Sequence, residues 1–381
     1  MQNFTFVNPT RIIFGKAVVA KLGPEAAKAG KKALFVYGGG SIKKNGVYDV
    51  IMESLARNGV AVTEHAGVKP NPALSHVQAG IAKARAAGCD LVVAAGGGSV
   101  IDEAKAIAAG AMYEGDVWDF FCGKAEIRQA LPLFTALTLP ATGSEMNAGC
   151  VVTNEVTAQK YSAHSPALFP RVSALDPETT LTLPREQVAY GAVDSIAHII
   201  EGYFTTRDAD AEVTDEIVHA LARSVVASTL RILKDPADYN ARASMMWSAT
   251  LALNGLATCG YGGTSFINHA IEHSLSAIYD IAHGAGLAIV MPAWFRHHLE
   301  TAGPARLEKF GAAVFGVSGA AETIAAFEDF FRRAGAPVRL AEAGIPAEDI
   351  PKISANAMGL IRLWGMKHEQ PEIEKILRLA V

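Results

Sequence analysis

Two segments place a carboxylate and several imidazoles at helical spacing. Asp194 and His198 lie four residues apart in "VDSIAHIIEGYF", and "NHAIEHSLSAIYDIAHG" contains His269, His273 and His283. Residues four apart on a helix project from one face. One carboxylate with imidazoles is a ligand set for ferrous iron, zinc or a similar divalent ion. Without a metal, such groups in an apolar helical region would leave buried charge unpaired. The pattern predicts a metal site, and spacing alone leaves open whether His269 or His273 is a ligand.

Six other histidines stand apart from this cluster. His65, His76, His219, His297, His298 and His368 are interpreted as hydrogen-bonded core or surface residues.

Two glycine-rich segments suggest a second kind of chemistry. "VYGGGSIKKNG" (36–46) and "AAGGGSVIDEAK" (94–105) each follow a short apolar run. Glycines let backbone N–H groups approach an anion closely, and a following helix N-terminus adds positive potential. Two such turns on strands of one sheet would face a shared crevice at the carboxyl ends of the strands. The pair therefore predicts nucleotide or phosphate binding.

The residues after the two turns differ in charge. The first turn is followed by Lys43 and Lys44, with no acid before Asp49, and this favours a cofactor with a 2′-phosphate. The second is followed by Asp102 and Glu103, which we interpret as caps that complement the dipole of the next helix.

A further segment bears on the substrate. Residues 248–283 contain no lysine or arginine and are rich in glycine, alanine and aromatic residues. A pocket lined by this segment lacks a cation to hold a phosphate or carboxylate. We therefore expect a neutral, largely apolar substrate.

The elements that must position these residues change character along the chain. Strand-like runs alternate with alanine-rich helical stretches in the first half, which favours a mostly parallel sheet. These runs are 31–38, 61–67, 89–97 and 132–142, and the first 30 residues are expected to add an edge strand or hairpin. Beyond 175–187 the pattern is almost entirely helical. We predict an α/β dinucleotide-binding domain over 1–184 and an all-helical metal-binding domain over 185–381.

Composition narrows the class of protein. The 381 residues include 34 Lys+Arg and 38 Asp+Glu, and no basic run exceeds a pair, which argues against nucleic-acid binding. No apolar stretch is long enough to span a bilayer, and the N-terminus lacks a signal-peptide pattern. The four scattered cysteines fit a reduced protein. We expect a cytoplasmic protein.

Several motifs together resemble one family. "GGGSIKKNGVYD", "VKPNP", "GGGSVIDEAKAIA", "LPATGSEMN", "DPETTLTLP" and "HAIEHSLSAIYDIAHG", with the Asp194–His198 pair, occur in order between about residues 8 and 290. As a set they resemble the iron-containing (group III) alcohol dehydrogenases, nearest to the NADPH-dependent aldehyde reductase and butanol dehydrogenase branch. The resemblance implies an N-terminal dinucleotide-binding domain and a C-terminal helical domain.

The resemblance also implies roles for individual residues. The implied metal ligands are Asp194, His198, His269 and His283, and His273 matches a nearby non-ligand histidine beside nicotinamide and substrate. The implied cofactor contacts are Gly39, Gly40 and Ser41 in the first turn, Asn71, Gly97, Gly98 and Ser99 in the pyrophosphate turn, and Thr138, Thr142, Asn147 and Lys160. Relatives that prefer NAD carry an aspartate where the first turn has Gly39, Gly40 and Ser41, and its absence agrees with the charge argument.

These features lead to one hypothesis and its rivals. We expect reversible hydride transfer between NADPH and a small neutral aldehyde, assisted by ferrous iron or zinc, in a homodimer, with His273 relaying the proton. Enzymes similar to dehydroquinate synthase, glycerol dehydrogenase and maleylacetate reductase are the alternatives. The absence of cations from residues 248–283 counts against the enzymes similar to dehydroquinate synthase and maleylacetate reductase, because their substrates carry carboxylates. A nucleotide-binding protein that is not an enzyme would not need all four metal-ligand residues.

Overall fold

The computed structural model describes residues 1–207 and 210–381 and divides the chain into two compact units. One unit is Val7–Leu183, and the other is Pro184–Val381 together with Met1–Phe6. The predicted domains differ from these units at the N-terminus. Residues 1–6 belong with the helical unit, where the backbone N–H of Gln2 donates to the carbonyl of Gly260 at 2.8 Å.

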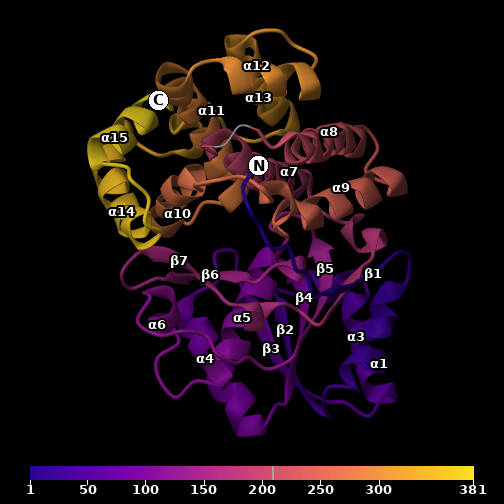
Figure 1. Cartoon of the computed structure of the whole chain (residues 1–381). Helices are drawn as coiled ribbons and strands as arrows, with labels where there is room; N and C mark the ends of the chain where they lie inside the picture. Colours follow the sequence, from indigo (N-terminus) through magenta and orange to yellow (C-terminus); the bar gives the residue numbers. More distant parts are fainter. Residues whose placement is uncertain (208–209) are drawn as a thin grey trace. The chain divides into compact units, whose positions relative to one another are not determined.

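The α/β unit contains a six-stranded sheet in the order β1-β8-β5-β4-β2-β3, with every pairing parallel (Figure 1). Its strands are β1 (Arg11–Phe14), β2 (Lys32–Gly38), β3 (Ala61–Val68), β4 (Leu91–Gly97), β5 (Leu133–Leu139) and β8 (Val172–Leu175). The antiparallel pair β6 (Gly149–Asn154) and β7 (Gln159–His164) lies outside this sheet. The parallel sheet and the N-terminal edge strand confirm the sequence prediction.

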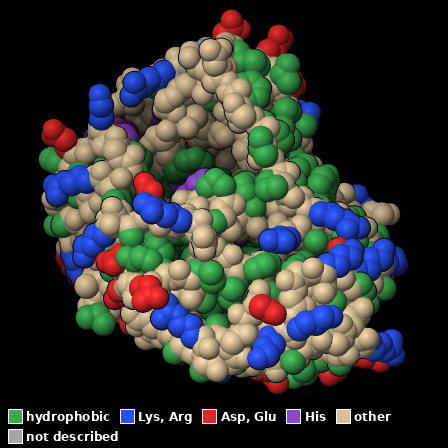
Figure 2. Space-filling view, turned by 60° about the horizontal axis from the view of Figure 1, so that its bottom comes forward, with side chains coloured by type: hydrophobic (Ala, Val, Ile, Leu, Met, Phe, Trp, Pro, Cys, Tyr) green, Lys and Arg blue, Asp and Glu red, His purple; other side chains and the backbone are tan. Residues whose placement is uncertain are grey.

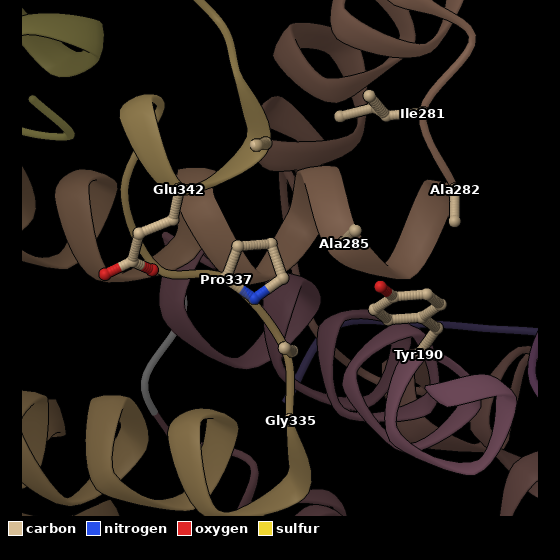
Figure 3. Close-up of a pocket in the computed structure, with 9 residues that line it drawn as sticks. Tyr190, Ile281, Ala282, Ala285, Gly335, Pro337 and Glu342 are labelled. Atoms are coloured by element: carbon tan, nitrogen blue, oxygen red, sulfur yellow. The ribbon is translucent and has the colours of Figure 1, made fainter. Parts of the chain in front are cut away.

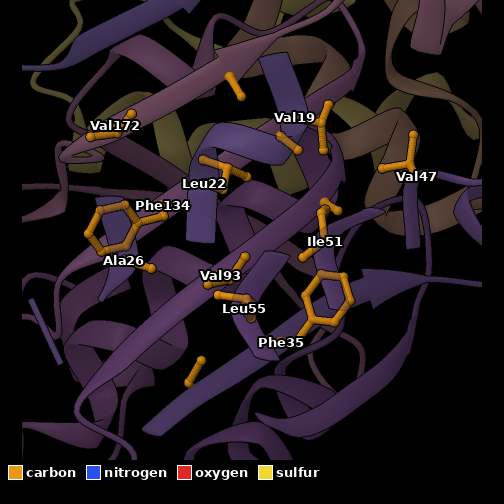
Figure 4. Close-up of a cluster of buried hydrophobic side chains, with 14 of the residues drawn as sticks. Val19, Leu22, Ala26, Phe35, Val47, Ile51, Leu55, Val93, Phe134 and Val172 are labelled. Atoms are coloured by element: carbon orange, nitrogen blue, oxygen red, sulfur yellow. The ribbon is translucent and has the colours of Figure 1, made fainter. Parts of the chain in front are cut away.

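The helices of this unit cover both faces of the sheet (Figure 1). They are α1 (Leu22–Ala26), α2 (Ser41–Lys44), α3 (Val47–Arg57), α4 (Leu74–Ala87), α5 (Gly98–Ala111) and α6 (Trp118–Phe121). On one face, Leu22 of α1 and Leu55 of α3 pack with Phe35, Val93 and Phe134 of the central strands (Figure 4). Covering of both faces explains why the central strands are continuous apolar runs.

The sheet order brings the two glycine turns together. The first turn follows the carboxyl end of β2 and the second follows that of β4, and these strands are direct neighbours with Tyr37 opposite Ala95. Both turns therefore lie at the same edge of the sheet, as the sequence pattern predicted.

The described part of the second unit is helical, as expected. Its helices are α7 (Arg185–Thr205), α8 (Glu212–Lys234), α9 (Tyr239–Ala252), α10 (Ile267–Tyr279), α11 (His283–Ala302), α12 (Ala305–Val314), α13 (Ala320–Ala334), α14 (Ile350–Leu363) and α15 (Gln370–Arg378). No helix among the described residues is long and apolar enough to cross a membrane.

The surface carries both signs of charge. Figure 2 shows lysine and arginine side chains interspersed with acidic and uncharged ones on the face it presents.

Candidate functional site

Three helices of the second unit bring four predicted residues to one point. Asp194 and His198 lie on α7, His269 lies on α10, and His283 is the first residue of α11. The Oδ1 atom of Asp194 is 3.3 Å from Nδ1 of His198, 3.8 Å from Nε2 of His269 and 3.6 Å from Nε2 of His283. One carboxylate oxygen is thus surrounded by three imidazoles.

The chemistry of this cluster fits a metal ion. Asp194 is 3% exposed and His269 is 5% exposed, and neither Oδ1 of Asp194 nor Nε2 of His269 has a hydrogen-bond partner among the described residues. Buried polar atoms are normally satisfied, and leaving one unsatisfied costs about 1–3 kcal/mol. A divalent cation bound by Asp194, His198, His269 and His283 would satisfy both atoms. The donor set of imidazole and carboxylate suits iron or zinc.

The protein's charges favour the ionised forms of two of these groups. Burial would raise the pKa of Asp194, but the charges of His198, His283 and His269 outweigh it and lower the pKa to about 2. Burial would lower the pKa of His269, but Glu201 and Asp194 raise it to about 9. Bound metal would displace the proton from His269, since the ligand form of imidazole is neutral.

Two glutamates that sequence analysis missed hold the outer nitrogens of the cluster. The Nδ1 atom of His269 is hydrogen-bonded to Glu201, and that of His283 to Glu272, and both glutamates are fully buried. Such carboxylates orient a metal-ligating imidazole and raise its basicity. A signal for one of them existed, because Glu201 lies seven residues after Asp194 and three after His198, on the same face of the helix.

Glycines allow the helices to approach closely enough to form the cluster. A Cβ atom on Gly284 would lie 2.2 Å from the carbonyl oxygen of Tyr190, and one on Gly286 would lie 2.7 Å from Glu272. Both distances are far shorter than van der Waals contact. The "HGAG" sequence at the start of α11 is therefore required by packing against α7 and α10.

His273 lies beside this cluster. Its ring centroid is 5.6 Å from that of His283, 6.5 Å from that of His269 and 5.8 Å from that of Trp364. It is buried on α10, one turn after His269. The geometry places His269 rather than His273 next to Asp194.

A cavity of about 500 Å³ lies close to the start of α11 in the same unit (Figure 3). Tyr190, Ala282, Ala285 and Pro337 line it, with Glu342 as its acidic side chain, and none of the four clustered residues does. The cavity is therefore a neighbour of the cluster and separate from it.

In the α/β unit the second glycine turn is tightly packed. Gly97 ends β4 and Gly98 begins α5, with the half-buried Ser99 next. A Cβ on Gly98 would lie 2.3 Å from Cγ2 of Thr142, and one on Gly97 would lie 3.0 Å from Cβ of Leu139. The turn thus allows close backbone approach at the N-terminus of a 14-residue helix, which suits a pyrophosphate.

The interpretation of Asp102 and Glu103 as helix caps is wrong. The helix begins at Gly98, and both carboxylates are buried within it. Asp102 accepts from the hydroxyl of Ser144 at 2.6 Å and from the backbone N–H of Val151 at 3.0 Å. Glu103 lies between two imidazoles. Partners from distant segments bind these side chains, and the helix dipole is not their main interaction.

The remaining predicted cofactor residues lie in the same unit. Asn147 accepts at Oδ1 from the ammonium of the fully buried Lys105 at 2.9 Å, and its amide donates to the carbonyl of Thr142 at 3.3 Å. Burial lowers the pKa of Lys105 to about 8, against the opposing charge of Asp102. Thr138 is buried in β5, Lys160 is buried in β7, and Asn71 has a left-handed backbone with φ of 53°.

The first glycine turn is open, and an acid lies near it. A Cβ on Gly39 or Gly40 would meet nothing within 4 Å, and Ser41 starts α2. Lys43 lies 4.4 Å from the ring centroid of Tyr48 and 3.9 Å from Oε2 of Glu64. Sequence analysis did not identify Glu64, which comes from the adjacent strand β3.

Comparison with known proteins supports one family. The model of the iron-containing alcohol dehydrogenases matches residues 9–177, and that of the C-terminal domain of the Fe-containing alcohol dehydrogenase family matches residues 188–381. A probable NADH-dependent butanol dehydrogenase of Bacillus subtilis is 43% identical, covering 94% of both chains. The NADPH-dependent aldehyde reductase of Escherichia coli is 37% identical, covering 93% of this chain and 92% of the relative.

A solved structure agrees with the sequence relatives. The crystal structure of an NADH-dependent butanol dehydrogenase A from Thermotoga maritima superposes with a TM-score of 0.97 at 48% identity, covering 100% of this chain and 99% of that one. Matches that span both units, together with the cluster of acid and imidazoles, imply an alcohol dehydrogenase with a nicotinamide cofactor and a divalent metal. The chain belongs to the iron-containing alcohol dehydrogenase family.

Proposed function

We propose that the protein is an NADPH-linked, metal-dependent enzyme that interconverts small neutral aldehydes and their alcohols. The observation that carries the proposal is the meeting of His198, His269 and His283 at Oδ1 of Asp194, at 3.3–3.8 Å. These four residues would hold the ion. The absence of lysine and arginine from residues 248–283 supports a neutral substrate.

The protein's own residues prepare the reaction. A bound divalent cation supplies a Lewis acid that polarises a carbonyl oxygen and stabilises the developing negative charge. Glu201 and Glu272 fix the rings of His269 and His283, so that each ring keeps its Nε2 atom directed toward Asp194. His273, buried beside them, is proposed to deliver the proton to the product alcohol.

The glycine turns are proposed to bind the cofactor, which supplies the hydride. The turn at Gly97, Gly98 and Ser99 would cradle the pyrophosphate, with Thr138, Thr142, Asn147 and Lys160 toward the nicotinamide side and Asn71 near the adenosine. The open turn at Gly39, Gly40 and Ser41 would lie at the adenosine ribose. There Lys43 and Lys44 supply positive charge for a 2′-phosphate.

One observation favours NADH as the alternative cofactor. Glu64 lies 3.9 Å from Lys43, and the hydrogen bond from Tyr37 lowers the pKa of its carboxyl. A charged carboxylate here offsets the lysine and would repel a 2′-phosphate. The Bacillus subtilis and Thermotoga maritima relatives are named as NADH-dependent enzymes, whereas the Escherichia coli relative is named as NADPH-dependent.

The test measures metal and activity together. The enzyme is loaded with ferrous iron or zinc and assayed with a panel of aldehydes against NADPH and NADH. We expect Asp194→Asn and His198→Gln to lose both metal and turnover, and His273→Ala to lose turnover with metal retained. Metal binding without aldehyde-dependent oxidation of either cofactor contradicts the reductase assignment. Loss of metal from the His273 variant means that the two histidines of α10 have exchanged roles.

A second variant tests the choice of cofactor. Glu64→Gln keeps the size of the side chain and removes its charge, so we expect the ratio of kcat/KM for NADPH over NADH to rise. A strong preference of the wild type for NADH refutes the assignment of residues 39–44 to a 2′-phosphate. We further propose a homodimer, for which light scattering after gel filtration should give twice the mass of the chain.

A further inference from the structure

A second group of metal-ligand residues lies within the α/β unit. His65 comes from strand β3, His76 from helix α4 and Glu103 from helix α5. Oε1 of Glu103 is 3.0 Å from Nε2 of His65 and 2.6 Å from Nδ1 of His76. The two imidazole rings lie 4.2 Å apart at their centroids. Three elements from separate parts of the chain thus direct nitrogen and oxygen donors at one point.

The burial of this group points to a ligand. The side chain of Glu103 is 0% exposed and that of His65 is 3% exposed. The second carboxylate oxygen of Glu103, Oε2, is buried and has no hydrogen-bond partner among the described residues. A fully buried carboxylate normally satisfies both oxygens, and an ion bound at this point would engage the unsatisfied one.

The distances suit a small divalent cation. One donor atom from each of the three residues lies within 4.8 Å of the other two. Donors that bind zinc at 2.0–2.2 Å in a tetrahedron lie about 3.3–3.6 Å apart. Small shifts of these side chains would therefore convert the hydrogen-bonded group into a three-ligand site. His76 is 31% exposed at its side chain, so the ion can enter from solvent and keep a water as fourth ligand.

Glycines give the group its space. A Cβ on Gly80 of α4 would lie 2.9 Å from Nε2 of His65 and 2.3 Å from Cδ1 of Ile107. Gly67 of β3 has a left-handed φ of 99° and lies opposite His76. A Cβ atom on Gly67 would lie 3.7 Å from Nε2 of His76. Helix α4 can approach His65 only because residue 80 lacks a side chain.

We propose that His65, His76 and Glu103 form a second divalent-metal site, for which zinc is the ion that imidazole and carboxylate donors favour. The site is separate from the cluster around Asp194, since each lies within a different compact unit. It joins β3, α4 and α5, and α5 begins with the second glycine turn. Its ion would therefore stabilise the α/β unit and fix the helix that carries this turn.

Zinc stoichiometry of the full-length protein tests the proposal. The metal-free protein is titrated with Zn²⁺, and bound metal is measured after gel filtration. We expect two equivalents in the wild type and one in Asp194→Asn. His76→Gln should also hold one equivalent, because the cluster around Asp194 lies in the other compact unit and keeps its own ligands.

A matched control separates ligand loss from general damage. His368 is also a half-buried histidine bonded to a glutamate, Glu372 at 3.0 Å, and is expected to bind no metal. His368→Gln should keep two equivalents, and zinc should raise the melting temperature of Asp194→Asn but not that of the Asp194→Asn/His76→Gln double variant. An Asp194→Asn protein that holds no zinc refutes the site. So does a His76→Gln protein that still holds two.

Discussion

Replacing Glu201 by glutamine tests whether the cluster around Asp194 binds a metal. Glu201 is hydrogen-bonded to Nδ1 of His269 and accepts from the backbone N–H of Asn268 at 2.5 Å. A glutamine has the same shape but offers one oxygen and no charge, so it must lose one of these bonds. Loss of such a partner weakens metal affinity by about 10–100-fold, which is about 1.4–2.7 kcal/mol. We expect this loss for Glu201→Gln, with His269 still in place as a ligand.

The assay is competition with a chromophoric chelator, which measures the dissociation constant for zinc. Glu328→Gln is the control, because Glu328 is a poorly exposed carboxylate of the same unit that binds Arg339 at 2.7 Å and Arg296. It should lower stability without changing affinity. The reasoning is refuted if Glu201→Gln binds within twofold of the wild type, or if Glu328→Gln weakens binding as much.

Three further changes test other parts of the molecule. Lys105→Met removes the buried ammonium that donates to Asn147 and Gly149 and whose charge favours ionised Asp102, and should destabilise the protein by about 3–5 kcal/mol, measured by urea unfolding. Gly98→Ala forces a Cβ to within 2.3 Å of Thr142 and should lower kcat/KM for the cofactor about 100-fold while metal content is unchanged. Burial, with the charges of neighbouring His297 and Arg306, lowers the pKa of His298 to about 4, so the unfolded chain binds more protons than the folded one between pH 6.5 and 4. The free energy of unfolding should therefore decrease as the pH is lowered from 6.5 to 4. The melting temperature of His298→Gln relative to that of the wild type should rise as the pH is lowered from 7 to 4.5.

The sequence predicted the sheet and the main cluster because local patterns determine them. The central strands β2, β4 and β5 are buried on both faces, so their apolar runs are visible in the chain. Asp194 and His198 are four apart on one helix, and that spacing is sufficient to predict a shared face. The family motifs added the choice of His269 over His273, which spacing alone could not make and which the distances to Asp194 favour.

The missed residues depend on contacts between distant segments. Glu201 and Glu272 look like ordinary helix charges until α7, α10 and α11 pack together. Asp102 and Glu103 follow a glycine turn, so the helix dipole was the nearest local explanation for them. Their actual partners lie tens of residues away along the chain, in positions that only the folded sheet brings close.

The same limit explains why the charge argument for the first glycine turn is incomplete. Along residues 38–49, the only charged residues before Asp49 are lysines. In the folded sheet, β2 pairs with β3 in a register that sets Phe35 opposite Glu64, so an acid from outside the segment reaches Lys43. The lysine is then partly neutralised and held near Tyr48, and less of its charge remains for a 2′-phosphate. Lys44 does not share this constraint, since no ion pair forms with it among the described residues. A preference for NADPH would therefore depend on Lys44 and on the open space at Gly39 more than on the pair of lysines as a unit.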